Sequence, residues 1–401
     1  MTAAPDQAPA GGRDPTAAVD VDAAIVGGGI AGLWLANLLH ARGYRTVVLE
    51  ADGIGGSQTL ASQGMIHGGL KYALSGNLTG ASEAIAGMPE RWRRCLAGGG
   101  DVDLGGLEPL SDRYYMFATS TALGRLTSFF ASRTLRGRIR RLEPPEYPAA
   151  FADPAFRGVV YELNDFVLDT PDLLAALLRP VADRVYRHRL LPGEVTPADG
   201  GCELRLPGAR LRARRLILTA GAGTGALLDH LGIASPRMQL RPLHQVLVRH
   251  DYPHPLYAHC LTGIRRPEPR MTITSHRDGD GWLWYLGGQI AGDGVAMSDA
   301  ELADHARREL AACLPWISWE RAGISTLRVD RAEPEQTGGR RPDEAFAAAV
   351  GPTVVAWPTK LSLVPDLGDK VLALLDPPRP GPAPRLELPR AGLGRVPWSR
   401  P

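Results

Sequence analysis

A histidine followed by two glycines, with a lysine close behind, is the first group of residues in this sequence that could do chemistry. The segment reads SQGMIHGGLKY and contains His67, Gly68, Gly69 and Lys71. An imidazole has an ordinary pKa of about 6.5, so His67 is a candidate catalytic base for a hydroxyl or amine proton. The glycines would let the backbone pass close to a planar ring. Two simpler interpretations remain: a histidine that only hydrogen-bonds to its surroundings, and a surface or ion-paired Lys71.

A glycine motif that binds diphosphates precedes this segment. The run GGGIAG (27–32) satisfies G-x-G-x-x-G. Gly27 permits a tight turn, Gly29 lets a diphosphate approach the backbone, and Gly32 lets helix and strand pack closely. Glu50 follows at close to the required spacing of about 20 residues, where its carboxylate would accept hydrogen bonds from ribose hydroxyls and repel a 2′-phosphate. The motif therefore predicts a dinucleotide without that phosphate.

Regular elements surround the motif in the required order. The apolar run VDAAIV (21–26) predicts a strand, LWLANLLHAR predicts the helix after the glycines, and RTVVLE (45–50) predicts a second strand. A helix that begins there would direct free N–H groups and its positive dipole end at the diphosphate. This β-α-β unit is what makes the short glycine motif informative.

Strand and helix patterns alternate along the rest of the chain. Further helices are expected at 81–97, from Thr170-Pro171, at 299–313 with Ser298 as cap, and near Lys360. A second strand, glycine turn and helix unit is expected at 211–232, antiparallel strands over 238–290, and a strand at 354–357. No internal repeat is found.

Four segments resemble FAD-dependent oxidoreductases of the D-amino-acid oxidase / glycerol-3-phosphate dehydrogenase superfamily. They are VLEADGIGGSQTLASQGMIHGGLKY (48–72), RLILTAGAGTGALL (215–228), GGRRPDEAF (338–346) and VVAWPTKLSLVPDLGDKVLALL (354–375), in family order. The resemblance implies FAD as cofactor, and an enzyme that transfers a hydride from a CH–OH or CH–NH group to the flavin. HGGLKY is more similar to the glycerol-3-phosphate and 2-hydroxyacid branch, which favours a CH–OH donor.

The resemblance also implies cofactor contacts outside the fingerprint. They are Ser57, Gly64, Ala220, Gly221, Thr359 and Lys360. Lys360, at the start of the last helix, would add a cation to a positive dipole end and favour the anionic reduced flavin, which makes it a candidate catalytic residue; a solvated lysine is the alternative. Many members have a glycine-rich turn where this chain has Trp357-Pro358-Thr359-Lys360. His67 could also tether the flavin covalently, as a histidine does in some related amine dehydrogenases.

An acidic or phosphorylated substrate would need an arginine to hold it. Four arginines are candidates: Arg265, Arg266, Arg331 and Arg341. The strand segments 274–276 and 282–285 could line the substrate pocket or belong to the core. The substrate is expected to be a small, anionic molecule.

Composition excludes several other classes. The net charge is +2 with basic residues scattered, so no nucleic-acid partner is expected. Four cysteines lie far apart, which argues against a disulfide framework and for a reducing cytoplasm. No apolar run reaches the length of a membrane span, and the N-terminus lacks a secretory signal. Prolines and the lack of carboxylate partners argue against a metal site at His250, His254 and His259.

The sequence therefore predicts an α/β protein with a Rossmann-like, doubly wound FAD-binding domain and an inserted substrate domain that contains a mixed or antiparallel sheet. The expected FAD-binding segments are 22–95, 155–235 and 325–376, and the substrate segments are 96–154 and 236–324. Residues 1–20 are expected to be a disordered leader, and 377–401 a proline-rich tail. Three activities stay open: a dehydrogenase with an unknown acceptor (oxygen, a quinone or a carrier protein), an amine or amino-acid oxidase that releases peroxide, and a non-catalytic FAD-binding subunit.

Overall fold

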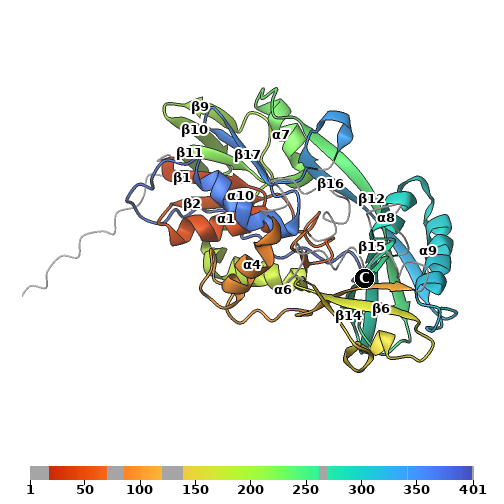
Figure 1. The fold of residues 1–401 in the computed structure, drawn as a ribbon. Coiled ribbons are helices and arrows are strands. Elements are labelled where there is room, and N and C mark those ends of the chain that lie inside the picture. Colours follow the sequence, from red (N-terminus) through yellow and green to blue (C-terminus); the bar gives the residue numbers. More distant parts are fainter. Residues whose placement is uncertain (1–17, 70–84, 120–138, 262–268, 341, 400–401) are drawn as a thin grey trace, which may run out of the picture.

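Two large sheets lie side by side and form the frame of the molecule (Figure 1). The computed structural model describes residues 18–69, 85–119, 139–261, 269–340 and 342–399. Each sheet contains eight strands within these residues, and a two-stranded ribbon lies beside them. We call the two sheets the FAD sheet and the substrate sheet.

The FAD sheet has a parallel centre. Its strands are β1 (Ala18–Val26), β2 (Thr46–Glu50), β8 (Val185–Arg187), β9 (Val195–Ala198), β10 (Gly201–Leu206), β11 (Ala209–Leu218), β17 (Phe346–Val350) and β18 (Thr353–Trp357). The order is β17-β18-β11-β1-β2-β8, with β17 antiparallel and the β9–β10 hairpin paired to the first half of β11. Because β18, β11, β1, β2 and β8 are parallel, their carboxyl ends share one edge, where this class of sheet binds its ligands.

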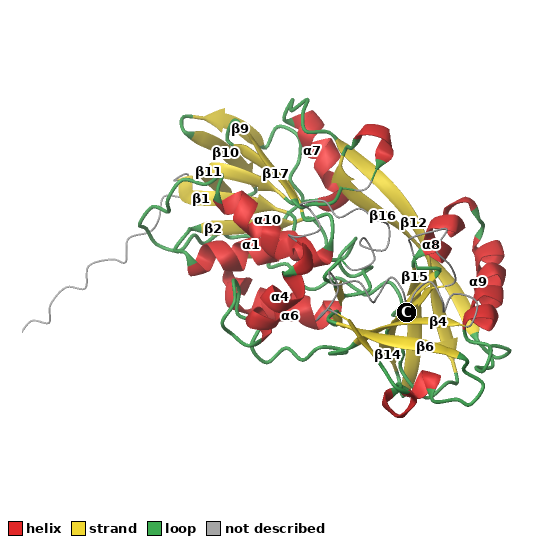
Figure 2. Ribbon diagram, viewed as in Figure 1, coloured by secondary structure: helices red, strands yellow, loops and turns green. Residues whose placement is uncertain are grey.

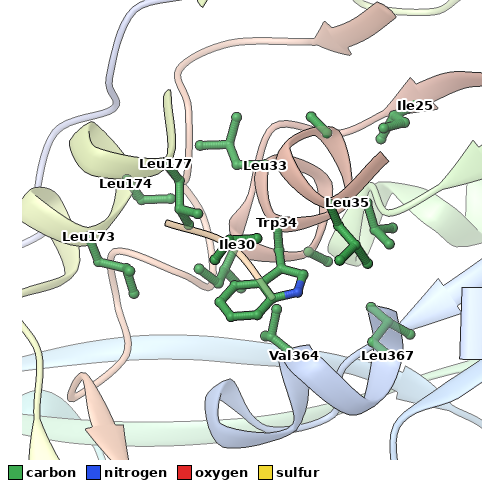
Figure 3. Packing of buried hydrophobic residues seen from close by; sticks show 14 of the residues in the cluster. Ile25, Ile30, Leu33, Trp34, Leu35, Leu173, Leu174, Leu177, Val364 and Leu367 are labelled. Atoms are coloured by element: carbon green, nitrogen blue, oxygen red, sulfur yellow. The ribbon is translucent and has the colours of Figure 1, made fainter. Parts of the chain in front are cut away.

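Helices from distant parts of the chain cover one face of the FAD sheet (Figure 2). They are α1 (Ile30–Ala41), α4 (Met88–Leu96), α6 (Thr170–Leu178) and α10 (Val364–Leu372). Trp34 on α1 is fully buried, and its ring centroid lies 4.8 Å from that of Trp92. Figure 3 shows Trp34 over Val364 of α10. This core joins the N-terminal β-α-β unit to the C-terminal helix.

The substrate sheet is mostly antiparallel. Its strands are β4 (Tyr114–Thr119), β5 (Ile139–Arg141), β6 (Gly158–Leu163), β12 (Met238–His250), β13 (Ala258–Leu261), β14 (Met271–Asp278), β15 (Gly281–Gly287) and β16 (Gly323–Pro334). The order is β16-β12-β15-β14-β13-β4-β6-β5, and β13–β4 is the one parallel pair among the described strands of this sheet. The helix α9 (Asp299–Cys313) covers its outer face with the predicted capping box of Ser298 and Glu301. The mixed sheet beside a parallel one matches the predicted fold class.

The remaining elements are short. They are the ribbon strands β3 (Met65–Ile66) and β7 (Phe166–Val167), the helices α7 (Thr224–His230) and α8 (Gln289–Asp293), and the 3-10 turns η3 (Pro144–Glu146), η4 (Ala149–Phe151), η5 (Arg179–Arg184), η6 (Gly221–Gly223), η7 (Gly294–Ala296), η8 (Thr337–Gly339) and η9 (Leu361–Leu363). No helix in the described ranges has the length and apolar character needed to cross a membrane.

Several expected boundaries shift. The strands β6 and β16 lie in the substrate sheet, whereas the expected boundary at 155 assigns β6 to the FAD-binding segments and the one at 325 cuts through β16. The helix α6 begins at Thr170, and Asp169, whose side chain accepts from Asp172 N–H, is its cap. The last helix begins at Val364, after the η9 turn, rather than at Lys360. Tertiary pairing or a neighbouring cap sets these limits, and a local sequence pattern contains neither.

Both predicted tails need correction where they are described. Ala18, Val19 and Asp20 pair with β11, so the leader could cover at most 1–17, which lie outside the described residues. Residues 377–399 pack on the protein, with Leu386, Ala391 and Trp398 buried. Proline and glycine content predicted no regular structure there, but burial of a few apolar side chains is enough to order a segment.

Candidate active site

Loops at the carboxyl ends of the parallel strands surround a cavity of about 850 Å³. Gly27 follows β1, Glu50 ends β2, Ala220 follows β11, and Trp357 ends β18, and all four line the cavity. The opposite wall comes from the substrate sheet, through residues of β12, β14, β15 and β16. The cavity therefore lies between the two sheets, at the edge where a parallel sheet binds nucleotides.

Close backbone contacts leave no room for a side chain at two of the three fingerprint glycines. Gly27 has φ of 105°, and a Cβ there would lie 2.5 Å from the carbonyl oxygen of Thr219. A Cβ on Gly32 would lie 1.9 Å from the carbonyl oxygen of Gly27. At Gly29 a Cβ would meet only Thr59 Oγ1, at 3.3 Å. The first and third glycines thus serve the turn and the packing, while Gly29 leaves space in front of the helix.

The N-terminus of α1 fits an anionic group. Gly29 caps the helix without a side-chain hydrogen bond, and the first turn carries no acidic residue, so the positive dipole end is not neutralised from within. Thr59 Oγ1 accepts the Ile30 N–H (3.2 Å), a contact that sequence reasoning missed because Thr59 lies in a distant loop. Glu50 accepts from Gly28 N–H (2.6 Å) and Asp52 N–H (3.0 Å), which holds its carboxylate at the cavity. These residues fit the diphosphate and ribose of FAD.

His67 lies in the cavity wall and is 8% exposed. Its backbone N–H donates to Ser362 Oγ (2.9 Å), which brings together two loops 295 residues apart. Its Nδ1 accepts from Gly69 N–H (3.2 Å). An Nδ1 that accepts favours the neutral tautomer with the proton on Nε2. Lys71, its companion in the sequence, lies outside the described residues.

The turn after β18 replaces glycines with a strained threonine. Thr359 has φ of 58°, the only positive φ among the described non-glycine residues. Lys360 N–H donates to the Pro358 carbonyl oxygen (2.6 Å), and this i to i+2 bond with positive φ is typical of the rare, strained form of the γ-turn. Thr359 Oγ1 donates to the Glu344 carbonyl oxygen (2.9 Å), which helps to hold the turn. The conformation usual for glycine is therefore kept without glycine.

Lys360 is buried at the cavity, so the interpretation as a solvated lysine is wrong. Its Nζ donates to the Asp343 carbonyl oxygen (2.8 Å), and the residue caps the η9 turn rather than α10 itself. A cation thus lies at the end of the cavity that also contains His67.

The loop 57–64 is attached to the substrate sheet by residues that sequence reasoning missed. Gln63 Nε2 donates to the carbonyl oxygens of Tyr285 (2.8 Å) and Thr272 (3.2 Å). The Tyr285 hydroxyl contacts Gln245 Oε1 and donates to the Ala61 carbonyl oxygen (2.6 Å), and burial raises its pKa. A glutamine or tyrosine in a 401-residue sequence gives no signal for such a contact.

Two arginines on neighbouring strands line the cavity. Arg241 of β12 and Arg331 of β16 are direct partners in the sheet register, and both face the cavity. Glu333, fully buried, accepts two hydrogen bonds from Arg241 (2.7 and 3.1 Å). Together the three side chains carry a net positive charge. Of the arginines expected to hold an anion, Arg331 lines the cavity, whereas Arg265, Arg266 and Arg341 lie outside the described residues.

The remaining residues predicted to contact the cofactor line the cavity, whereas those considered for the substrate pocket do not. Ser57, Gly64, Ala220, Gly221 and Thr359 all line the cavity. The segments 274–276 and 282–285 contribute no lining residue and are largely buried core of the substrate sheet. The nearby residues that do line the cavity are Thr272, Gly287 and Gly288.

A comparison with protein families decides the identity. Residues 22–352 match the family model described as FAD dependent oxidoreductase. The chain belongs to this family. It is an FAD-dependent oxidoreductase, and the predicted resemblance, cofactor and enzyme class are confirmed.

Known proteins with similar sequence or structure match most of the chain. The probable FAD-dependent oxidoreductase PA4991 of Pseudomonas aeruginosa is 48% identical over 390 residues, which cover 96% of this chain and 97% of that protein. Its crystal structure superposes with a TM-score of 0.81, covering 95% of this chain and 98% of that one, at 42% identity in the structural alignment. Glycine oxidase of Geobacillus kaustophilus shares the fold, with a TM-score of 0.63, 19% identity, and coverage of 90% and 96%.

Proposed function

We propose that this oxidoreductase oxidises a CH–OH group of a small, anionic substrate, with His67 beside the reacting carbon. FAD, when bound, would supply the two-electron acceptor for the hydride. One observation carries the proposal: the hydrogen bond from His67 N–H to Ser362 Oγ brings His67 and Lys360 to the same end of the cavity. A cytoplasmic location is proposed from the four buried, free cysteines.

Charge supports an anionic substrate. Arg241, Arg331 and Glu333 together carry one more positive than negative charge, and Lys360 adds a further cation to the cavity lining. An arginine can bind a carboxylate or phosphate through two parallel hydrogen bonds. Arg331→Met should therefore raise KM for an anionic donor more than it lowers kcat.

Two roles for His67 follow from its geometry. As a base it would take the hydroxyl proton, which requires an imidazole nitrogen without a proton. The hydrogen bond from Gly69 N–H to Nδ1 favours the second role, in which Nε2–H donates to the substrate oxygen and orients it, while the hydroxyl proton passes to solvent water. Lys360, in either case, would stabilise negative charge on the reduced cofactor.

An anaerobic screen of flavin reduction tests the substrate class. The holoenzyme is mixed with hydroxy acids, polyol phosphates and amino acids, and bleaching of the flavin absorbance is followed. We expect reduction by a hydroxy acid or polyol phosphate. Reduction by amines or amino acids alone, with peroxide released under air, would establish the amine oxidase alternative. Repeating the screen with oxygen, a quinone or a carrier protein as reoxidant identifies the electron acceptor.

Two variants and a pH profile distinguish the roles of His67. His67→Ala should slow flavin reduction by the true donor by roughly 10²-fold or more if the ring transfers the proton. His67→Gln keeps an N–H donor but cannot act as a base near neutral pH, so it recovers the rate only if the ring orients the substrate. For a base, the wild-type rate rises with pH as the imidazole loses its proton, because only the neutral ring accepts a proton. Acid precipitation that leaves flavin in the protein pellet would reveal a covalent link.

A further inference from the structure

The C-terminal segment continues the FAD sheet at its open edge. We call residues 377–399 the C-terminal strap. Arg187 N–H, on the edge strand β8, donates to the Pro389 carbonyl oxygen (2.7 Å), and Ala391 N–H donates to the Val185 carbonyl oxygen (3.3 Å). Tyr186 and Arg390 form an antiparallel bridge, with the guanidinium 4.2 Å from the ring centroid. These contacts cover an edge strand whose N–H and C=O groups would otherwise be open.

The strap next crosses the loop that lines the cavity. Ile54 N–H donates to the Gly392 carbonyl oxygen, and Gly394 N–H donates back to the Ile54 carbonyl oxygen, both at 2.9 Å. The crossing leaves no room for a side chain: a Cβ on Gly394 would lie 2.6 Å from Gly56 Cα, and one on Gly53 would lie 2.9 Å from Gly394 Cα. Gly53 and Gly56 line the cavity, so the strap contacts the backbone of the loop 53–63 on the side away from the cavity.

The strap ends on the substrate sheet, beside β15 (Figure 1). Trp398, 8% exposed, packs on the rings of His276 (4.8 Å) and Tyr285 (5.3 Å), and its carbonyl oxygen accepts from Arg249 Nη2 (2.9 Å). Tyr285 is also the residue whose hydroxyl donates to the Ala61 carbonyl oxygen. The strap therefore supports the loop 53–63 at both ends, directly at Ile54 and through Tyr285 at Ala61.

We propose that the C-terminal strap is a positioning element for the cofactor: it holds the loop 53–63 in the conformation that binds FAD. Gly394 sets the separation between strap and loop, and Trp398 fixes the strap to the substrate sheet. The strap does not line the cavity within the described residues, so it acts on FAD only through the loop. Its role goes beyond the proposed substrate chemistry and does not depend on which donor is oxidised.

Two glycine variants give a matched test. Gly394→Ala forces the strap and Gly56 apart, whereas Gly392→Ala meets nothing within 4 Å. The Kd for FAD is measured by titrating each apoprotein and following quenching of flavin fluorescence. We expect Gly394→Ala to raise Kd by about tenfold or more, a change of about 1.4 kcal/mol, and to alter the visible circular dichroism of the bound flavin. Gly392→Ala should retain the wild-type Kd and spectrum.

A strap that only stabilises the fold would give a different result. Thermal unfolding of the Gly394→Ala apoprotein would then shift relative to Gly392→Ala, while Kd and the bound-flavin spectrum would be equal in the two variants; this outcome overturns the proposal. Trp398→Ala and Trp398→Phe form a second pair for the case in which Gly394→Ala does not fold. We expect weaker FAD binding in Trp398→Ala and recovery in Trp398→Phe, and equal binding in both would also overturn the proposal.

Discussion

Gly29 and Gly32 belong to one motif but restrict side chains for different reasons. Gly29→Val should leave the fold intact, because a Cβ there meets only Thr59 Oγ1, yet the side chain would enter the space in front of α1. FAD affinity should fall by at least about 100-fold, since hydrogen bonds from the helix N-terminus to a charged diphosphate, each worth about 1.5–3 kcal/mol, would be lost. The measurement is flavin retained after gel filtration.

Gly32→Ala is the matched contrast. Its Cβ would lie 1.9 Å from the Gly27 carbonyl oxygen, so the strand and helix must separate. We expect loss of folded protein rather than selective loss of cofactor, as judged by far-UV circular dichroism. A folded Gly32→Ala protein that merely binds FAD weakly would contradict this division of roles.

Thr359 makes a second prediction at the scale of one residue. Thr359→Gly and Thr359→Ala both lose the hydrogen bond to the Glu344 carbonyl oxygen, but only glycine adopts a φ of 58° without strain. Thr359→Gly should therefore unfold at higher urea concentration than Thr359→Ala, by about 1 kcal/mol in free energy of unfolding. Equal stability would show that the turn relaxes when its side chain is removed.

At the scale of elements, the meeting of the His67 loop with the turn after β18 determines the site. Ser362→Ala would leave the buried His67 N–H without its acceptor, at a cost of about 1–3 kcal/mol of stability. We expect a changed flavin absorbance spectrum and slower flavin reduction as His67 moves relative to Lys360. Stopped-flow reduction with the identified donor measures the effect.

Ser298→Ala is the control with the same chemical change. Ser298 caps α9 on the outer face of the substrate sheet, and its replacement by alanine should lower the free energy of unfolding by about 1 kcal/mol. Its flavin spectrum and reduction rate should match the wild type. If Ser362→Ala also kept both, the hydrogen bond would serve stability alone.

Local patterns predicted the elements whose signals are local. The β-α-β unit with Gly27, Gly29, Gly32 and Glu50 could be identified because its periodicity and glycine spacing lie within one short stretch. The contacts of Gln63 with Tyr285 could not, since they join residues that only the packed sheets bring together. The burial of Trp398 was missed for the same reason: flanking prolines suggested a tail, and the surface that covers the ring lies on other strands.

At the scale of the whole molecule, the site exists only where the two sheets meet. The FAD sheet supplies the glycine turns, Glu50 and Lys360, and the substrate sheet supplies Arg331 and Thr272. Because the loop 57–64 is hydrogen-bonded to the substrate sheet through Gln63, a shift between the sheets would also move the cofactor-binding loop. Stability of the substrate sheet is therefore a condition for cofactor binding.

The buried His276 and the half-buried His250 make the substrate sheet sensitive to acid. Burial lowers the pKa of both His250 and His276 from 6.5 to about 4. Between these values the unfolded chain binds a proton at each ring that the folded protein excludes, so the free energy of unfolding rises with pH over this range. Stability from this source is fully present above about pH 6.5 and is lost as pH falls toward 4, at about 1.4 kcal/mol per pKa unit for each ring.

His276→Phe tests this linkage. The ring packs on Trp398, its Nδ1 is buried without a hydrogen-bond partner among the described residues, and its Nε2 is hydrogen-bonded to Thr274 Oγ1 (3.2 Å), which also accepts from Gln63 Nε2 (3.4 Å). The variant loses the bond to Thr274 at every pH, but in urea unfolding it should lose less stability than the wild type between pH 8 and pH 5, because one protonation site of the unfolded chain is gone. Apoprotein is measured in parallel, since acid release of FAD would lower stability in both proteins alike. Parallel pH profiles for variant and wild type would show that His276 does not titrate with unfolding, and the acid sensitivity would then rest on His250.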